Sequence, residues 1–268
     1  MIVDIEIICI GNELLIGKIE NTNAHWLATQ TTALGANVRR ITVIQDTVEQ
    51  IATCLQETSN RKPHFIITTG GLGPTFDDKT FQGIAQALNQ PLKINPQALK
   101  MVQTKCNEYA QSRGLIGEVE MTLPRTKMAL LPQNTHPLPN PVGTAPALKA
   151  QLGSSTLFAL PGVPSEMRAI FTQTLTPLIR QAVETCIFCE KSLFVEGIAE
   201  AQLAPLIDRV MIDNAGVYVK SHPLERHTDN IPHIELHLTI TIAQEHKPVE
   251  MLQRAIEQLT QLIDQTQK

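Results

Sequence analysis

The sequence is poor in aromatic residues and has no surplus of basic ones. Phenylalanine, tyrosine and tryptophan make up 4% of the 268 residues, with a single tryptophan and two tyrosines. This disfavours a surface on which single-stranded bases would stack. Lysine and arginine number 22 against 26 aspartate and glutamate residues, a net charge of −4. General binding to nucleic acid needs a basic surface that displaces counterions from phosphates, so we expect no nucleic-acid partner.

The sequence also lacks segments that direct a protein to or across a membrane. Its first six residues contain Asp4 and Glu6 and no basic residue, unlike a signal peptide. No run approaches the roughly 20 apolar residues of a membrane-spanning helix. Five scattered cysteines suit reduced thiols better than a disulfide framework. We therefore expect a cytoplasmic protein with no membrane partner.

An alternation of strand and helix patterns dominates the first two thirds of the sequence. The strands are expected at 5–10, 41–45 and 64–69, and the helices at 22–34, 48–55, 79–88 and 96–113. This alternation predicts βαβ units, hence an α/β fold with a mostly parallel sheet and helices on both faces. The strand patterns lack polar alternation, as expected of strands that are covered on both sides.

The pattern changes twice toward the carboxyl end. Eight of the 17 prolines fall between Pro124 and Pro164, which predicts extended loops around two short strands at 128–131 and 156–160. Pro164 suits the first turn of a helix running to about Val183. Beyond residue 188, a strand–helix–strand–strand–helix order predicts a small α+β domain. We expect its elements at 193–198, 201–212, 217–220, 233–242 and 249–263, and the two domains at 1–188 and 189–268.

Four unusual segments each follow a predicted strand of the parallel sheet. They are 11–17, 45–47, 70–78 and 161–164. In an open α/β sheet such loops gather at the carboxyl edge of the strands, where ligands bind. The shared position of the four loops predicts a binding site there.

The segment 70–78 (GGLGPTFDD) is the most informative of the four. Gly70, Gly71 and Gly73 allow successive N–H groups to converge on an anion, and the helix that follows favours a phosphate at its N-terminus. Asp77 and Asp78 would repel a phosphate unless Mg²⁺ lay between the charges. A glycine-rich turn followed by an aspartate helix cap would give the same pattern without a ligand.

Three known catalytic patterns are missing. Gly11 and Gly17 are separated by five residues rather than the four of a P-loop, and Ile19 replaces its serine or threonine. The spacing of 70–73 does not match the dinucleotide-binding fingerprint. There is no Gly-x-Ser-x-Gly turn of a serine hydrolase.

Other polar residues have a structural interpretation beside the functional one. Asp46 follows a strand, where it could cap the next helix, and Glu166 lies in a first helical turn, where a carboxylate is favoured by the helix dipole. Lys220 ends a strand and could reach an anion or remain solvated. Two candidate metal groups have ligand-like spacing but either an exposed setting or too few ligands. These groups are His222, His227, His233 and His237, and the pair Cys186 and Cys189.

Several motifs, in this order, resemble the competence/damage-inducible protein A (CinA) family. The resemblance is close over about 5–185 and extends through the second domain. It is carried by 11–17 with 21–23, 69–74 with 77–78, 140–146, 160–167, 220–223 and the strand 233–239. One departure is Ala147, where the family usually has glycine.

The resemblance implies a molybdopterin-binding, MoaB/MogA-like first domain and a homodimer. It also implies metal-dependent hydrolysis of ADP-ribose to AMP and ribose 5-phosphate. Asp46 and Asp78 stand where related adenylyltransferases hold Mg²⁺ and nucleotide phosphate. Many members carry a further nicotinamide mononucleotide deamidase domain, and with the sequence ending at Lys268 we expect the short form without it.

We therefore expect hydrolysis of a nucleoside diphosphate-sugar, with ADP-ribose as the best substrate and Mg, Mn or Co as the divalent metal. Asp46 and Asp78 would hold the metal, and Glu13 or Glu166 would orient the water. The expected substrate contacts are Asn23, Gly70, Gly71, Gly73, Thr144, Gly162 and Lys220. Two alternatives stay open: an adenylyltransferase or binding protein of molybdenum cofactor biosynthesis, and a non-catalytic binding module.

Overall fold

A computed structural model describes residues 3–114, 117–183, 186–224, 231–243 and 246–267. The chain divides into two compact units: the first contains Ile2–Thr31 and Asn37–Ala182, and the second contains Val183–Lys268, with Thr32–Ala36 grouped with it. The boundary that we predicted at 188 falls inside the first strand of this second unit, β9 (Cys186–Glu196). Among the described residues, no helix is both long and apolar enough to cross a membrane.

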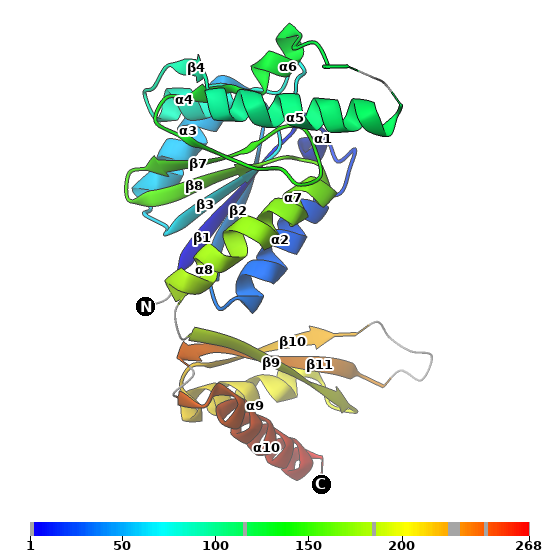
Figure 1. The fold of residues 1–268 in the computed structure, drawn as a ribbon. Helices are drawn as coiled ribbons and strands as arrows, with labels where there is room; N and C mark the ends of the chain where they lie inside the picture. Colours follow the sequence, from blue (N-terminus) through cyan, green and yellow to red (C-terminus); the bar gives the residue numbers. More distant parts are fainter. Residues whose placement is uncertain (1–2, 115–116, 184–185, 225–230, 244–245, 268) are drawn as a thin grey trace. The chain divides into compact units, whose positions relative to one another are not determined.

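The first unit is built on a six-stranded sheet in the order β2-β1-β3-β8-β7-β6 (Figure 1). Its strands are β1 (Asp4–Ile10), β2 (Asn37–Ile44), β3 (Phe65–Thr69), β6 (His136–Leu138), β7 (Ala147–Leu152) and β8 (Ser155–Leu160). The four strands β2, β1, β3 and β8 run parallel, whereas β7 and β6 run antiparallel to their neighbours. The mostly parallel sheet predicted from the sequence is confirmed.

Helices cover both faces of this sheet (Figure 1). Ile51, Phe81 and Val102 from α3, α4 and α5 pack with Ile8 of β1 on one face. On the other face, Trp26 of α2 meets Phe171 edge to face, with ring centroids 5.3 Å apart. The helices of this unit are α1 (Asn12–Leu15), α2 (Thr22–Ala33), α3 (Val48–Asn60), α4 (Thr80–Ala87), α5 (Pro96–Ser112), α6 (Leu123–Lys127), α7 (Pro164–Ile170) and α8 (Thr176–Val183).

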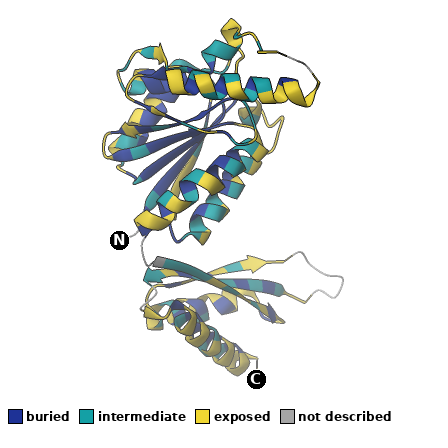
Figure 2. Ribbon diagram, in the orientation of Figure 1, coloured by how far each residue is buried: buried dark blue, intermediate teal, exposed yellow. Residues whose placement is uncertain are grey.

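The central strands are buried as the sequence predicts. Every residue of β3 is buried, and so is every residue of β1 after Asp4 (Figure 2). Burial on both faces explains why these strands lack polar alternation.

The proline-rich segment contains more strand than we predicted. The range 128–131 is not one strand, because Met128 caps α6 and only Leu130–Pro132 forms β5, which pairs with β4 (Leu92–Ile94) in a separate small sheet. The sequence analysis missed β6 and β7. Lysine and glutamine interrupt β7, and β6 contains Pro137 but lies at the sheet edge, where a missing N–H is tolerated.

The predicted helix from Pro164 to Val183 is interrupted. A π-helical turn, η1 (Phe171–Leu175), separates α7 from α8. Pro177 lies just after this turn. Its ring would clash with a carbonyl of a regular α-helical turn, and it has no N–H to donate there. The wider turn avoids the clash and needs no such hydrogen bond.

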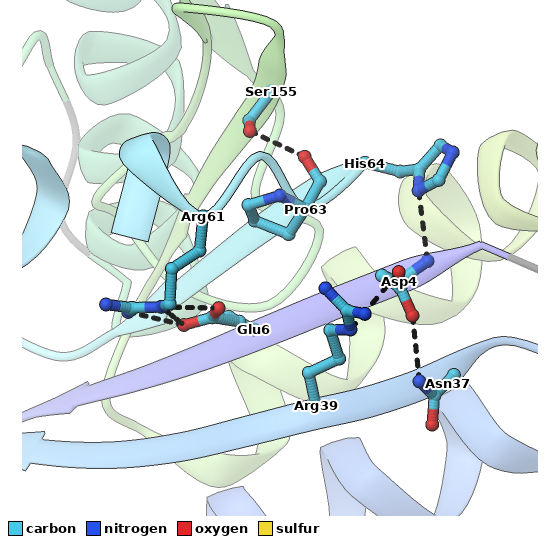
Figure 3. Close-up of polar contacts among 8 residues, drawn as sticks. All are labelled: Asp4, Glu6, Asn37, Arg39, Arg61, Pro63, His64 and Ser155. Atoms are coloured by element: carbon cyan, nitrogen blue, oxygen red, sulfur yellow. Dashed lines mark hydrogen bonds and ion pairs between the residues drawn. The ribbon is translucent and has the colours of Figure 1, made fainter. Parts of the chain in front are cut away.

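Polar groups at the amino-terminal end of the sheet are paired (Figure 3). Glu6 of β1 is 2% exposed and accepts hydrogen bonds from Nε and Nη2 of Arg61 at 2.8 and 2.6 Å. Arg61 also donates to Oγ1 of Thr58 at 2.9 Å. Nearer the surface, Asp4 forms an ion pair with Arg39 at 3.2 Å. These contacts join β1 to β2 and to the end of α3.

The second unit has the strand–helix–strand–strand–helix order expected from its sequence. Its antiparallel sheet runs β10-β11-β9, and apolar residues of both helices pack with those of the strands in one core. The elements beside β9 are α9 (Glu200–Asp213), β10 (Val217–Pro223), β11 (His233–Ala243) and α10 (Pro248–Thr266). On β11 buried residues alternate with half-buried ones up to Ile240, which confirms the predicted alternating strand.

Candidate functional site

A cleft of about 870 Å³ opens at the carboxyl edge of the parallel strands. Residues from the loops after β1, β2, β3 and β8 line it together. These are the four loops that the sequence analysis placed on one edge. Residues of α5, α6 and the loop before β7, among them Tyr109, Arg125 and Thr144, complete its wall.

The loop after β3 requires glycine at its first two positions. Gly70 has a φ of +111°, and a β-carbon there would overlap the carbonyl oxygen of Ile10. Gly71 has a φ of +67°, and a β-carbon would overlap Oγ1 of Thr80, which itself donates to the carbonyl of Gly70 at 2.8 Å. Any other residue would be strained at both positions. The loop therefore passes closer to β1 and α4 than a side chain would permit.

The N–H groups of this loop are not all free to bind a ligand. Gly70 donates its N–H to the carbonyl of Leu160 at 3.0 Å, so it shapes the cleft and is not the phosphate donor that we expected. In the described part of the chain, the N–H groups of Gly71 and Gly73 have no hydrogen-bond partner, and both residues line the cleft. Their amides are therefore available to an anion, as is that of Leu72, which also lines the cleft and whose N–H has no partner among the described residues.

Asp46 does not cap the helix that follows it. Thr47 caps α3 instead, because its side chain accepts from the N–H of Gln50 at 3.4 Å. Asp46 lines the cleft, and its Oδ1 accepts from the N–H of Lys79 at the start of α4, at 3.4 Å. The structural alternative that we gave for Asp46 is therefore wrong.

The carboxylate of Asp46 is poorly compensated. Burial raises its pKa to about 6, against 3.8 for an ordinary aspartate, and the hydrogen bond from Lys79 only partly opposes this. The negative charges of Asp78, Asp77 and Glu13 raise the pKa further. Four carboxylates thus gather at one end of the cleft, an arrangement that a cation would stabilise.

Asp78 is held in place by its own loop. Its Oδ2 accepts from the N–H and the hydroxyl of Thr75, at 2.8 and 2.5 Å. The same oxygen lies beside Gly73, which also lines the cleft: a β-carbon on Gly73 would be 2.6 Å from it. Asp77 is exposed, and its hydrogen bond with Thr75 lowers its pKa. Neither aspartate caps α4 through its side chain, so that structural alternative is also wrong.

The donors around Asp46 suit a hard divalent cation. No group of three or more histidine, cysteine, aspartate or glutamate side chains is arranged to hold a metal among the described residues. Mg²⁺ commonly binds through one or two carboxylates and completes its shell with substrate phosphates and water. Asp46 and Asp78, next to the free amides of Gly71 and Gly73, fit that mode.

The two candidate bases have different surroundings. Glu13 folds back over Gly11 and lies close enough to Asp46 to raise its pKa. Glu166 accepts a hydrogen bond from Nδ2 of Asn140 at 2.6 Å and packs on Gly143. Glu166 lines the cleft, but its contacts support the loop before β7, whereas Glu13 belongs to the acidic group.

Asn23 connects two of the cleft loops. Its Nδ2 donates to the carbonyl of Gly162 at 2.7 Å and to Oγ1 of Thr69 at 3.2 Å. Its Oδ1 is buried with no hydrogen-bond partner among the described residues. The backbones of Gly162 and Gly70 touch, since a β-carbon at Gly162 would lie 3.3 Å from the α-carbon of Gly70.

Sequence reasoning missed Lys127. This residue ends α6, and its Nζ donates to the carbonyl oxygens of Gly73, Thr75 and Asp78, the last at 2.8 Å. The lysine lies about fifty positions away in the sequence, and no local pattern marks it.

The remaining candidates lie in the second unit. Lys220 is exposed on β10, and its role at the cleft stays a prediction. The rings of His222 and His237 are 6.3 Å apart, Nε2 of His237 lies 3.2 Å from a carboxylate oxygen of Glu190, and Nδ1 of His233 lies 3.4 Å from one of Glu196. His227 and the side chain of Cys186 lie outside the described residues. The described part of this unit has no group of three metal-ligating side chains.

A known protein family matches the unit that contains the cleft. The family described as a probable molybdopterin binding domain matches residues 6–181. The chain belongs to this family. The MoaB/MogA-like first domain expected from the sequence motifs is thereby confirmed.

Proteins from archaea resemble the chain over most of its length. A protein of Pyrobaculum calidifontis is 43% identical over 257 residues, which cover 96% of this chain and 94% of that protein. A protein of Aeropyrum pernix is 45% identical over 217 residues, 81% of this chain and 78% of that protein.

Among solved structures, the protein CinA of unknown function from Thermoplasma acidophilum is 34% identical, with a TM-score of 0.57. The match covers 66% of this chain and 98% of that one. The resemblance to CinA noted from the motifs is therefore confirmed.

Proposed function

We propose that the cleft binds a phosphate-bearing nucleotide or pterin together with a divalent cation. One observation carries the proposal: the unpartnered amides of Gly71 and Gly73 lie beside Asp46 and Asp78 in a single cleft. Membership in a family of probable molybdopterin binding domains supports it. The cleft volume of about 870 Å³ lies in the range of small-molecule sites.

Each group has a defined task in this proposal. Gly71 and Gly73 donate N–H hydrogen bonds to phosphate oxygens, and their fixed loop means that little rearrangement is needed on binding. Asp46 and Asp78 would hold the cation, which would supply neutralisation of the phosphate charge. Asn23 fixes the position of the opposite wall through Gly162 and Thr69.

Isothermal titration calorimetry tests the binding proposal. We expect ADP-ribose, ATP and AMP to bind more tightly in the presence of Mg²⁺ than in excess EDTA, and adenosine, which has no phosphate, to show no such dependence. Equal affinity with and without Mg²⁺ would contradict the cation, and no binding of any phosphate-bearing ligand, a pterin phosphate included, would contradict the proposal.

We propose hydrolysis of ADP-ribose as the second candidate function. The observation that favours it is Glu13, a carboxylate beside Asp46 that is additional to the two proposed cation ligands. Glu13 would accept a proton from water as the water oxygen bonds to a phosphorus of the diphosphate. The bond from that phosphorus to the bridging oxygen breaks, and AMP and ribose 5-phosphate leave.

Product analysis separates hydrolysis from binding and from transfer. Purified protein is incubated with ADP-ribose and Mg²⁺, Mn²⁺ or Co²⁺, and the products are resolved by chromatography. We expect AMP release that is lost in Glu13→Gln and kept in Glu166→Gln, with ADP-ribose affinity unchanged in both variants. Binding without AMP release would reject hydrolysis, and adenylylation of a pterin substrate by ATP would favour the transferase.

A further inference from the structure

Lys127 makes contacts that are unusual for a lysine near a cleft. All three of its hydrogen-bonding partners are main-chain carbonyl oxygens of one short loop: Gly73 at 3.4 Å, Asp78 at 2.8 Å, and Thr75. An ammonium group has three N–H donors, so these contacts use its full donor capacity. Lys127 is therefore not a group that donates to a ligand.

The contacted loop has little other support on that side. Residues 74–77 are exposed, and the loop from 72 to 79 forms neither helix nor strand. Its internal hydrogen bonds link Thr75 with Asp77 and Asp78. They close the tip of the loop but do not attach it to the rest of the unit. The two ends of the loop are attached elsewhere, since Leu72 is buried in the core and the N–H of Lys79 donates to Asp46. For the part between them, 73–78, Lys127 supplies the attachment within the described residues.

The backbone of Lys127 is itself firmly held. The next two residues, Met128 and Ala129, are 5% and 0% exposed and belong to the core between the sheet and α3, α4 and α5. The carbonyl of Ala129 accepts from the N–H of Asn95 at 2.9 Å. A lysine side chain is flexible, but here the backbone next to it is anchored in the core, and its Nζ is held by three carbonyl oxygens.

The contacts also bear on the acidic group of the cleft. Asp78, Asp77 and Asp46 all lie near enough to Lys127 to interact with its charge, and they oppose the lowering of its pKa by burial. The lysine thus partly balances the repulsion among these carboxylates before any ligand arrives. The loop then presents Gly73 and Asp78 to the cleft.

We infer that Lys127 is a positioning residue that fixes the loop 73–78 in the conformation that binds phosphate and cation. This inference rests on the proposed function, since it concerns how the binding loop is held. Lys127 acts on the ligand only through the loop backbone.

Hydrogen exchange and calorimetry on three full-length variants test the inference. Lys127→Met removes the donors and the charge, Lys127→Arg keeps both, and Lys93→Met removes an exposed lysine of β4 as the matched control. We expect Lys127→Met to accelerate exchange at least about tenfold at the hydrogen-bonded amides of 71–79, those of Thr75, Asp78 and Lys79, with little change in β1. We expect its affinity for ADP-ribose with Mg²⁺ to fall at least tenfold. Lys127→Arg should retain most of the affinity, and Lys93→Met should match the wild type.

The outcomes are distinguishable. Unchanged exchange in 71–79 of Lys127→Met overturns the inference, and so does faster exchange with unchanged affinity. Exchange that rises equally in β1 indicates general destabilisation, and Lys127→Gln, which keeps two N–H donors, is then measured as well. If Lys127→Gln shows no effect specific to the loop, the inference is overturned. If the wild-type protein binds no phosphate-bearing ligand, a pterin phosphate included, the proposed function fails, and the exchange data still decide whether Lys127 holds the loop.

Discussion

A buried or half-buried carboxylate lies at each end of the parallel sheet, and its charge is compensated at one end but not at the other. At the amino-terminal end, Glu6 is almost fully buried and is matched by two hydrogen bonds from Arg61. At the carboxyl end, Asp46 is half-buried and has one long hydrogen bond from Lys79, with further carboxylates around it. The first arrangement is complete within the chain. The second is not compensated within the described residues, which is why we propose that a cation binds there and place function at that end.

The largest effect is expected on stability, from removing the Arg61 partner of Glu6 at the amino-terminal end. Arg61→Met leaves the buried carboxylate of Glu6 without its partner, and we expect the free energy of unfolding to fall by about 3 kcal/mol. The companion variant Arg39→Met breaks the more exposed pair with Asp4 and should cost less than about 1 kcal/mol. Urea unfolding of both variants gives the comparison. Similar losses in the two would refute the distinction.

The next largest effect is expected at the other end. If the chain hydrolyses ADP-ribose as proposed, Asp78→Asn should lower turnover by about two orders of magnitude, because it removes a carboxylate that we propose holds the cation. Stability should change little, since an asparagine oxygen can still accept from Thr75. Asp77→Asn, at the exposed neighbouring position, is the control and should retain most activity. Undiminished turnover in Asp78→Asn refutes the assignment.

A smaller effect of opposite sign is expected from Asp46→Asn. The pKa of Asp46 in the folded state, about 6, exceeds the ordinary 3.8, so the folded protein holds this proton more tightly than the unfolded chain. Ionisation of Asp46 therefore lowers the free energy of unfolding. This loss is small near pH 4, grows as the pH rises toward the folded-state pKa, and is complete above about pH 7. After allowance for solvent, Asp46→Asn should stabilise the protein by about 1 kcal/mol at pH 8 and by almost nothing at pH 4. Equal effects at both pH values in urea unfolding would contradict this.

The smallest effect is that of the cation alone. Without nucleotide, 10 mM Mg²⁺ should raise the melting temperature at pH 8 by about 2 °C, as expected for a site with millimolar affinity. The rise should disappear in Asp46→Asn and persist in Arg39→Met. A rise of the same size in all three proteins would point to a general salt effect.

The sequence predicts what depends on local pattern. The apolar run before Gly70 gave the buried strand β3, and the glycines and aspartates after it gave the loop that lines the cleft. Residues from the four loops after parallel strands do meet there, because the topology of such a sheet brings them together. The homodimer, the metal and the substrate stay predictions.

Contacts between distant segments could not be predicted. The Thr47-x-x-Gln50 spacing is itself a local signal that Thr47 caps α3, but the hydrogen bond between Asp46 and Lys79 at the start of α4 joins distant segments and has no local signal. Whether the N–H of Gly70 is free depends on Leu160, in the strand next to it. Lys127 reaches its loop only because Met128 and Ala129 are anchored in the core. Each of these outcomes depends on packing, which a single sequence does not encode locally.

The close approach of Gly162 to Gly70 has a mechanical consequence. Two turns from distant parts of the chain share one contact plane with no side chain between them. A ligand that pushed one turn toward the other would therefore press backbone against backbone. A side chain at Gly162 would crowd the α-carbon of Gly70, and one at Gly70 would overlap the carbonyl oxygen of Ile10.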